Sequence, residues 1–207
     1  MVIGTFIFNG EGSVSRAVTV SVGGLPFQVK DSGTYVVNSD CSGSIALPTN
    51  SDTFHFNVVD EDSVAIVAMT PNQSGAGTLK RQQIRNCRTE TFFGTYIFNG
   101  NGFGTYQPAP PPYPYSMDVF FPVSVVGTWV FDGKGKVTRS LSLSFDGFPL
   151  PYPDQGSYLV NSDCSLSAYF SSDNEPFQLN AINARTLVVG VVAPGRAGAG
   201  TLVKQTL

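Results

Sequence analysis

The stretch GTYVVNSDCSGS at residues 33–44 recurs almost unchanged as GSYLVNSDCSLS at residues 156–167, which is 123 positions later. Extending the comparison in both directions without a gap pairs residues 4–82 with residues 127–205. In this comparison about 29 of 79 positions are identical. A gapless match of this length predicts an internal duplication of one structural unit.

Each copy has the pattern of a chain built from short strands. TVSV (19–22) and LSLSF (141–145) alternate polar and apolar residues with period two, which is typical of strands with one buried face. Asn9-Gly10 and Asp132-Gly133 follow short apolar runs and predict tight two-residue hairpin turns. No stretch combines helix caps with a period near 3.6. The sequence therefore predicts an all-β protein of about seven strands per copy, arranged as antiparallel barrel-like domains in tandem.

The second copy is preceded by an extra segment, FFGTYIFNGNGFG at residues 92–104, which predicts one further strand followed by a turn. With this strand the second copy reaches about eight strands and closes a barrel, whereas the first copy lacks an opening strand. We expect its open edge to be covered by the other copy, by a neighbouring subunit, or by residues outside this sequence. The predicted domains are 1–82 and 93–207, joined by a linker at 83–92.

Composition excludes several classes of protein. Of the 207 residues 42% are hydrophobic and 13% are charged, so the chain is not of the disordered, highly charged kind. The net charge of −3 gives no basic surface for nucleic acid. No stretch approaches the roughly 20 apolar residues of a membrane span. The start MVIGTFIFNG lacks the features of a signal peptide, so we expect either no export or a leader outside this sequence.

The three cysteines, Cys41, Cys87 and Cys164, fit no zinc motif, and with a single histidine in the chain no metal or other cofactor is predicted. The repeated NSDC is interpreted as a turn followed by a small buried thiol or half of a disulfide, since the adjacent carboxylate opposes a reactive thiolate. Pairing of Cys87 with Cys164 would tie the extra strand to its own barrel and leave Cys41 without a partner. This pairing requires an oxidising compartment.

Two charged positions recur in both copies. Arg16 matches Arg139, and Asp31 matches Asp154. We expect an Arg–Asp pair within each copy, with either a structural role or a role in ligand binding at the mouth of the barrel.

Two segments rich in proline and aromatic residues belong to the second copy. QPAPPPYPYS (107–116) is interpreted either as a loop packed on its own barrel or as a docking arm or lid. FPLPYPDQ (148–155) is interpreted as a second loop, and the two form a binding rim if they lie at the same end. The candidate aromatic binding residues are Tyr106, Tyr113, Tyr115, Phe148 and Tyr152.

Three further features receive structural interpretations. His55 stands between two phenylalanines and matches Gln178, so we expect a solvent-facing polar residue rather than a catalytic one. The acidic residues 60–62 are interpreted as a solvated turn, because their spacing is incomplete for calcium. Trp129 should fill the interior of its barrel, as Phe6 does in the first copy.

The repeated motifs G-T-[YFW]-x-F-[ND]-G-x-G-x-V, G-[TS]-Y-x-V-N-x-D-C-[ST] and G-x-G-T-L-x-[KR]-Q resemble small β-barrel domains of secreted bacterial proteins of unknown function. Those domains are similar in shape to the barrel of allene oxide cyclases and spirotetronate cyclases, which is lipocalin-like. In such domains a cysteine often precedes the first strand, as Cys87 does here. The resemblance implies an exported protein and carries over no catalytic residue.

The function that these observations favour is a non-catalytic, secreted or cell-surface barrel module with a structural or binding role. Its expected partner is another strand edge, through self-association by strand exchange or edge pairing. The alternative is a small-molecule-binding barrel that acts as a cyclase or isomerase by shaping an apolar cavity. The apolar residues on the alternating faces predict a filled interior, which favours the first interpretation.

Overall fold

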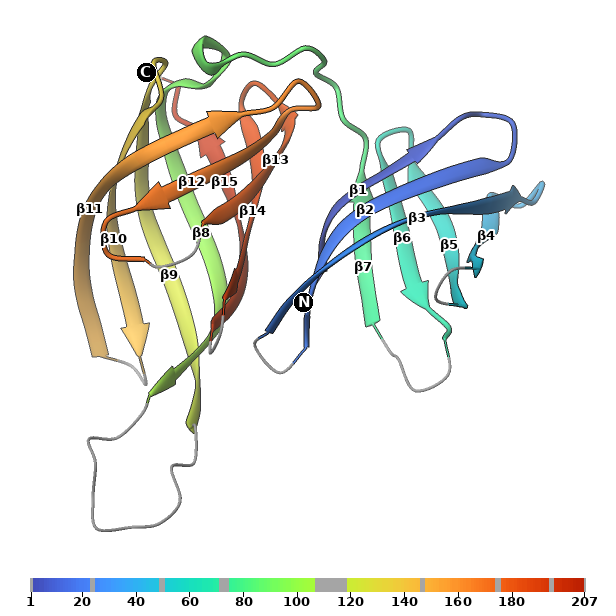
Figure 1. Ribbon diagram of the computed structural model, residues 1–207, viewed down its shortest axis with the longest axis horizontal. Coiled ribbons are helices and arrows are strands. Elements are labelled where there is room, and N and C mark those ends of the chain that lie inside the picture. The colour runs from blue at the N-terminus through green and yellow to red at the C-terminus, as the bar shows by residue number, and fades with distance from the viewer. Residues whose placement is uncertain are drawn as a thin grey trace. The chain divides into compact units, whose positions relative to one another are not determined.

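The computed structural model describes residues 2–22, 25–48, 51–70, 75–106, 119–145, 148–173, 176–193 and 196–206. The described chain is almost entirely strand and forms two antiparallel sheets in two compact units. One sheet has seven strands and is curled into a half-barrel, and the other is a closed barrel of eight strands (Figure 1). The prediction of an all-β protein with two tandem barrel-like domains is confirmed.

The half-barrel follows the chain order from β1 to β7. Its strands are β1 (Val2–Phe8), β2 (Ser13–Val22), β3 (Leu25–Val37), β4 (Ser42–Leu47), β5 (Asp52–Asp60), β6 (Ser63–Ala68) and β7 (Gly75–Lys80). Among the described residues no strand bridges β7 to β1, so the sheet stays open, as expected from the missing opening strand. Its small core is formed by Val14, Ile45, Leu47 and Phe56.

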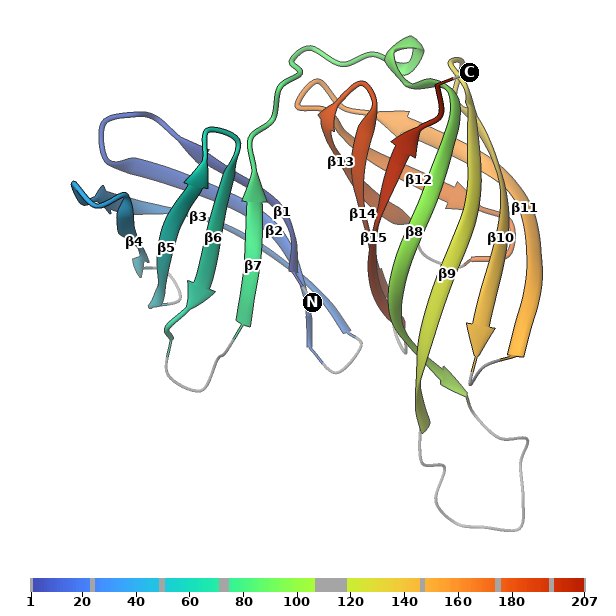
Figure 2. The ribbon, with the colours of Figure 1, turned by 180° about the vertical axis from the view of Figure 1, so that it is seen from behind.

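The barrel closes because β8 pairs with both β15 and β9, as Figure 2 shows. Its strands are β8 (Phe93–Tyr106), β9 (Val119–Asp132), β10 (Lys136–Phe145), β11 (Phe148–Val160), β12 (Ser165–Phe170), β13 (Phe177–Asn183), β14 (Thr186–Ala193) and β15 (Arg196–Lys204). A short 3-10 helix, η2 (Thr89–Phe92), precedes β8. The sheet and the barrel lie within the first and second predicted domains, whose boundary residues stay a prediction.

The turn that follows the first strand of each copy is longer than predicted. The segment between β1 and β2 is the four-residue loop 9–12, in which Gly10 and Gly12 have φ of 84° and 92°. The Asn9 side chain accepts hydrogen bonds from the backbone N–H groups of Glu11 and Ser13. The two-residue turn was wrong because the asparagine here caps the loop with its side chain and does not adopt a positive φ.

The extra segment before the second copy is one strand without a turn. β8 continues through Asn99-Gly100 to Tyr106, and it pairs along its length with β9. Gly100 and Gly102 lie opposite Gly200 and Gly198 of β15. The predicted turn was wrong because partners on both sides hold the backbone extended, which overrides the local preference of Asn-Gly.

The segment 148–155 was also wrongly predicted as a loop, since it forms the first part of β11. It pairs only with β10 on one side, because pairing of β11 with β12 begins at Gly156. Proline lacks the backbone N–H and is tolerated where a strand has an unpaired side. Pro149, Pro151 and Pro153 take alternate positions along this segment.

The repeated stretch at residues 33–44 and 156–167 forms the same bend and turn in both sheets. An ideal Cβ at Gly156 would lie 1.8 Å from the carbonyl oxygen of Tyr169, and one at Gly33 would lie 1.9 Å from that of Ala46. Glycine therefore permits the close approach of two strands where the long strand bends. In the turn that follows, Cys41 and Cys164 share a φ of 65°. The described residues contain no helix that is long and apolar enough to span a membrane.

Candidate functional site

The candidate site is the interior of the barrel, and one end of that interior is closed. Residues 84–92 lie at the end where β8 begins (Figure 2), and Cys87 and Phe92 are buried there. The Tyr158 hydroxyl donates to the carbonyl oxygen of Thr89 over 3.1 Å. Because these residues join the main core of the barrel, the segment predicted as a linker acts as a lid that closes this end.

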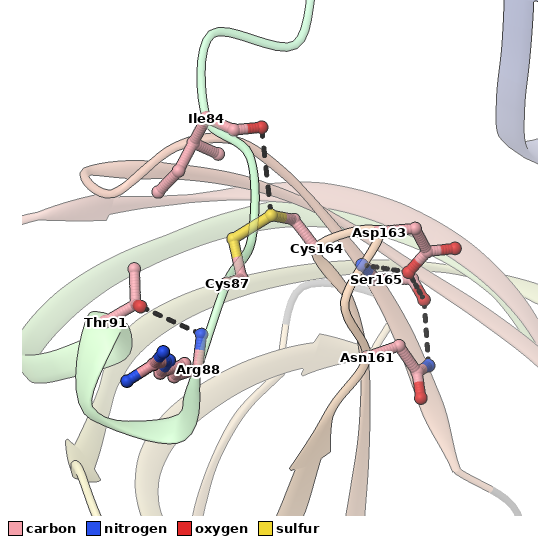
Figure 3. The surroundings of a disulfide bond; sticks show 8 residues. All are labelled: Ile84, Cys87, Arg88, Thr91, Asn161, Asp163, Cys164 and Ser165. Atoms are coloured by element: carbon pink, nitrogen blue, oxygen red, sulfur yellow. Dashed lines mark hydrogen bonds between the residues drawn. A yellow bond between two sulfur atoms is a disulfide. The ribbon is translucent and has the colours of Figure 1, made fainter.

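A disulfide fastens this lid to the barrel wall. Cys87 pairs with Cys164, which lies in the turn between β11 and β12 (Figure 3). Figure 3 also shows the carbonyl oxygen of Ile84, which lies 3.8 Å from the Cys164 sulfur. The backbone N–H of Arg88 donates to the Thr91 hydroxyl and begins the 3-10 helix. The predicted pairing is confirmed, and Cys41 is free, as this pairing requires. Cys41 is exposed, so the interpretation of a small buried thiol or half of a disulfide at this turn is wrong for the first copy.

Aromatic rings fill the middle of the barrel and form a floor. Trp129 is fully buried, and its ring lies 4.9 Å from the ring of Phe170 and 5.4 Å from that of Phe177, both edge to face. The ring of Phe98 lies 5.9 Å from the ring of Trp129. The prediction that Trp129 fills the interior is confirmed.

Above this floor the barrel is hollow. A cavity of about 480 Å³ is lined mainly by apolar side chains. Its wall includes Phe98, Val125, Leu141, Leu143, Tyr152 and Phe177. The inward positions Gly100, Gly102, Gly198 and Gly200 also border it and contribute no side chain. The expectation of a filled interior is therefore wrong for this half of the barrel, and the cavity has the size and apolar character of a small-molecule pocket.

Arg139 is the cation among the described lining residues, and two carboxylates hold it. Its Nη2 lies 3.1 Å from Asp154 Oδ2 and also contacts Asp173 Oδ2. The guanidinium carbon stands 3.8 Å above the centre of the Phe170 ring and 5.2 Å from that of Tyr152. The charge is thus neutralised and stacked within the wall, so the site presents no free cation to an anionic ligand.

Arg16 has an equivalent arrangement in the half-barrel. It contacts Asp31 and Asp52, each over 2.7 Å. Burial lowers the pKa of Arg16, but the hydrogen bonds to both carboxylates outweigh it and raise that pKa above its ordinary value. Both predicted Arg–Asp pairs are therefore present, each with a second carboxylate.

Hydrogen bonds lower the pKa of Asp154. Burial raises the pKa of this carboxyl, but the hydroxyls of Ser171 and Ser172 donate to it and hold its pKa well below the usual range. At the closed end, burial raises the pKa of Tyr96 to about 12, and its hydroxyl donates to the carbonyl oxygen of Ala184. Burial also raises the pKa of Tyr158. These tyrosines therefore act as neutral hydrogen-bond donors.

Among the predicted aromatic site residues, Tyr152 lies in the cavity wall. Tyr106 ends β8 and Phe148 begins β11, and only their backbone is described. Tyr113 and Tyr115 lie outside the described residues, as does the proline-rich segment 107–118. Because the strands alternate in direction, Tyr106 and Phe148 mark the open end of the barrel, opposite the lid.

The remaining candidates have structural environments. His55 is exposed on β5 while Phe56 is buried, as expected. The backbone N–H of Asp62 donates to the Asp60 side chain within the turn between β5 and β6. In the part of the chain that the structure describes, no cluster of three or more ligating side chains could hold a metal ion.

Sequence reasoning missed the second carboxylates, Asp52 and Asp173. They do not match each other in the repeat, because Asp52 matches Glu175 and Asp173 matches Asn50. It also missed Phe177 and the glycines of β8 and β15 as cavity residues. Comparison with protein-family models finds no match, and comparison with curated proteins finds none either.

Proposed function

We propose that the chain is an exported, non-catalytic barrel protein whose closed barrel binds an uncharged, mainly apolar small molecule. The observation that supports this most directly is the cavity of about 480 Å³ above the aromatic floor. Ligand pockets in proteins are typically concave, largely preformed and about 300–1,000 Å³ in volume. A barrel closed at one end and hollow at the other is suited to hold a molecule that enters from the open end.

The charges in the wall favour an uncharged ligand. Arg139 and Asp173 are the charged residues among those described around the cavity, and they are paired with each other. With Asp154 included, the cluster has one more negative than positive charge, so an anionic head group gains no cation here. The same pairing leaves neither group available for acid–base chemistry, and this favours binding over the alternative of a cyclase or isomerase.

The disulfide supports the proposed location outside the cytoplasm. Structural disulfides form and persist in secreted and cell-surface proteins, and Cys87–Cys164 is buried at the lid. The hollow barrel supports the lipocalin-like resemblance. The shared turn geometry at Cys41 and Cys164 supports an internal duplication.

Binding of N-phenyl-1-naphthylamine, a neutral apolar fluorophore, tests the proposed pocket. We expect a saturable rise in its emission with the intact protein. Val125 and Leu143 are cross-strand partners that face the cavity. The double substitution Val125→Trp/Leu143→Trp should fill the cavity and weaken binding about 10-fold or more.

The neighbouring pair provides a matched control. Val126 and Ser142 are also cross-strand partners, but both are exposed on the outer surface. Val126→Trp/Ser142→Trp should leave binding unchanged. Equal affinity in the two double variants, or no saturable binding by the unaltered protein, would refute a ligand site in the barrel. If the tryptophan pair lowers thermal stability, Val125→Phe/Leu143→Phe is compared with Val126→Phe/Ser142→Phe in the same way.

A further inference from the structure

The half-barrel is open at the place where the barrel has an additional strand. β7 and β1 match parts of β15 and β9, which lie 123 positions later in the chain. In the barrel, β8 fills the space between β15 and β9 and pairs with both. In the half-barrel, β7 pairs with β6, and no described residue occupies its other edge.

β7 has glycine at two positions where a neighbouring strand such as β8 would leave no room for a side chain. In β15, an ideal Cβ at Gly200 would lie 2.6 Å from the Asn99 carbonyl oxygen of β8, so glycine is needed there. The matching residue of β7 is Gly77, whose Cβ would meet only Ile66, at 4.0 Å. A Cβ at Gly75, which matches Gly198, would meet nothing within 4 Å. These glycines are therefore not required by any described contact of the half-barrel itself.

One aromatic residue at this edge is exposed although its counterpart in the barrel is buried. Phe131 of β9 is fully buried, and the ring of Tyr96 from β8 packs against it at 5.4 Å. The matching residue Phe8 is 39% exposed. A strand with an aromatic residue facing inward would cover it, as β8 covers Phe131.

The third feature is Cys41, which matches Cys164 of the barrel but forms no disulfide. It has the φ and the turn hydrogen bonds of Cys164, since Asn38 and Asn161 head equivalent turns. Cys164 is bonded to Cys87, which stands six positions before the first residue of β8, Phe93. Cys41 is exposed and unbonded.

From these matches we infer that the half-barrel binds, between β7 and β1, an extended strand supplied from outside residues 1–207. The strand has the pattern of β8, with inward aromatic residues followed by two glycines opposite Gly75 and Gly77, and with a cysteine six positions ahead that bonds to Cys41. A second copy of this chain is a poor donor, because its β8 is paired on both sides within its own barrel.

The covalent step is an oxidation of two thiols. The Cys41 thiol and the thiol of the incoming strand lose two electrons and two protons, and one sulfur–sulfur bond forms. The oxidant is a small disulfide of an oxidising compartment, such as oxidised glutathione, which leaves as two thiols.

A synthetic peptide with the sequence of residues 85–106 tests this inference on the full chain. Its cysteine is activated as a disulfide with thionitrobenzoate, so attack by the Cys41 thiolate releases thionitrobenzoate, which is measured by absorbance. A matched peptide carries Gly100→Val and Gly102→Val. We expect the glycine peptide to react at least about 10-fold faster, because docking raises the effective concentration of the two sulfurs. Amide hydrogen exchange should slow in β7 and β1 on reaction.

Variants of the protein separate docking from the reactivity of the thiol. Gly75→Val/Gly77→Val places side chains into open space in the half-barrel, so the fold should persist. This variant should lose the rate advantage of the glycine peptide yet react with free dithionitrobenzoate like the unaltered protein. Equal rates for both peptides would overturn the inference. A Cys41–Cys41 dimer that forms without peptide and protects β7 would overturn it as well, since a second copy would then occupy the edge.

Discussion

Arg139 shows how a buried charge is accommodated in this protein. The residue is 4% exposed, and its guanidinium group pairs with Asp154 and Asp173 and stacks on Phe170. A buried ion in a protein is stable only when good geometry and further hydrogen bonds compensate its lost hydration. The repeated Arg–Asp pair was visible in the sequence, but the second carboxylate was not, because Asp173 matches Asn50 and the second carboxylate of the first copy, Asp52, stands two positions further along.

The carboxyl group of Asp154 should make the stability of the barrel depend on acid pH. Because its pKa in the folded barrel lies below the value of about 3.9 in an unfolded chain, its contribution to the free energy of unfolding is fully present above that value. The contribution is lost as the pH falls through the lower, folded pKa. We expect Asp154→Asn to be less stable than the unaltered protein at pH 7 and to lose less stability between pH 5 and pH 2, measured by urea unfolding.

Asp163→Asn is a suitable control for this titration. Asp163 lies in the exposed turn before Ser165 and away from the Arg139 cluster. Its substitution leaves Asp154 and its hydrogen bonds in place, so the loss of stability between pH 5 and pH 2 should be larger than for Asp154→Asn. Parallel profiles for Asp154→Asn and the unaltered protein would contradict the role assigned to Asp154.

At the level of elements, pairing with neighbouring strands decides the structure of segments whose local sequence fits both a strand and a turn. The sequence FNG occurs at residues 98–100, within β8, and at residues 8–10, where β1 ends and a loop begins. The difference arises because β8 has hydrogen-bonded neighbours on both sides at Asn99 and Gly100. The proline-rich first part of β11 likewise forms a strand, because it has no hydrogen-bonded neighbour on its β12 side before Gly156.

The lid segment depends on its disulfide. Cys87 and Cys164 are 77 positions apart, and closing a loop of this length restricts the unfolded chain considerably. We expect Cys87→Ala/Cys164→Ala to lower the free energy of unfolding of the barrel by about 2–4 kcal/mol. Urea unfolding followed by the emission of Trp129, the single tryptophan, reports on the barrel.

Cys41→Ala provides the matched control for the disulfide. Cys41 occupies the same turn with the same φ but is unbonded. Its substitution should change the unfolding of the barrel very little, whereas a strong reductant, which opens Cys87–Cys164, should destabilise this variant and the unaltered protein alike. If both variants shifted the midpoint equally, the disulfide would not be what stabilises the lid.

At the level of the whole molecule, two similar successions of strands differ in one respect: the second closes into a barrel and the first stays an open sheet. The barrel has eight strands and a large core with a fully buried Trp129, whereas the half-barrel has seven strands and a smaller core. A closed barrel leaves no strand edge unpaired, and an open sheet leaves two. We therefore expect the barrel to be the more stable unit.

This difference predicts that residues 84–207 fold without the rest of the chain. The segment contains all eight barrel strands, the lid and both disulfide cysteines. Expressed alone, it should unfold in one cooperative transition and retain the near-ultraviolet circular dichroism of Trp129. Residues 1–83 expressed alone should unfold at a lower urea concentration, and the opposite order of stability would show that closure is not the deciding factor.

The sequence by itself determined the strand content, the matching halves and the recurring Arg–Asp pair, because these follow from patterns that are local or that repeat at one fixed spacing. It favoured the pairing of Cys87 with Cys164, which the structure confirms. The cavity, the lid and the second carboxylates were decided only by the tertiary structure. They depend on which side chains meet across strands far apart in the chain. The glycines at 100 and 200 leave space only because β8 and β15 lie side by side.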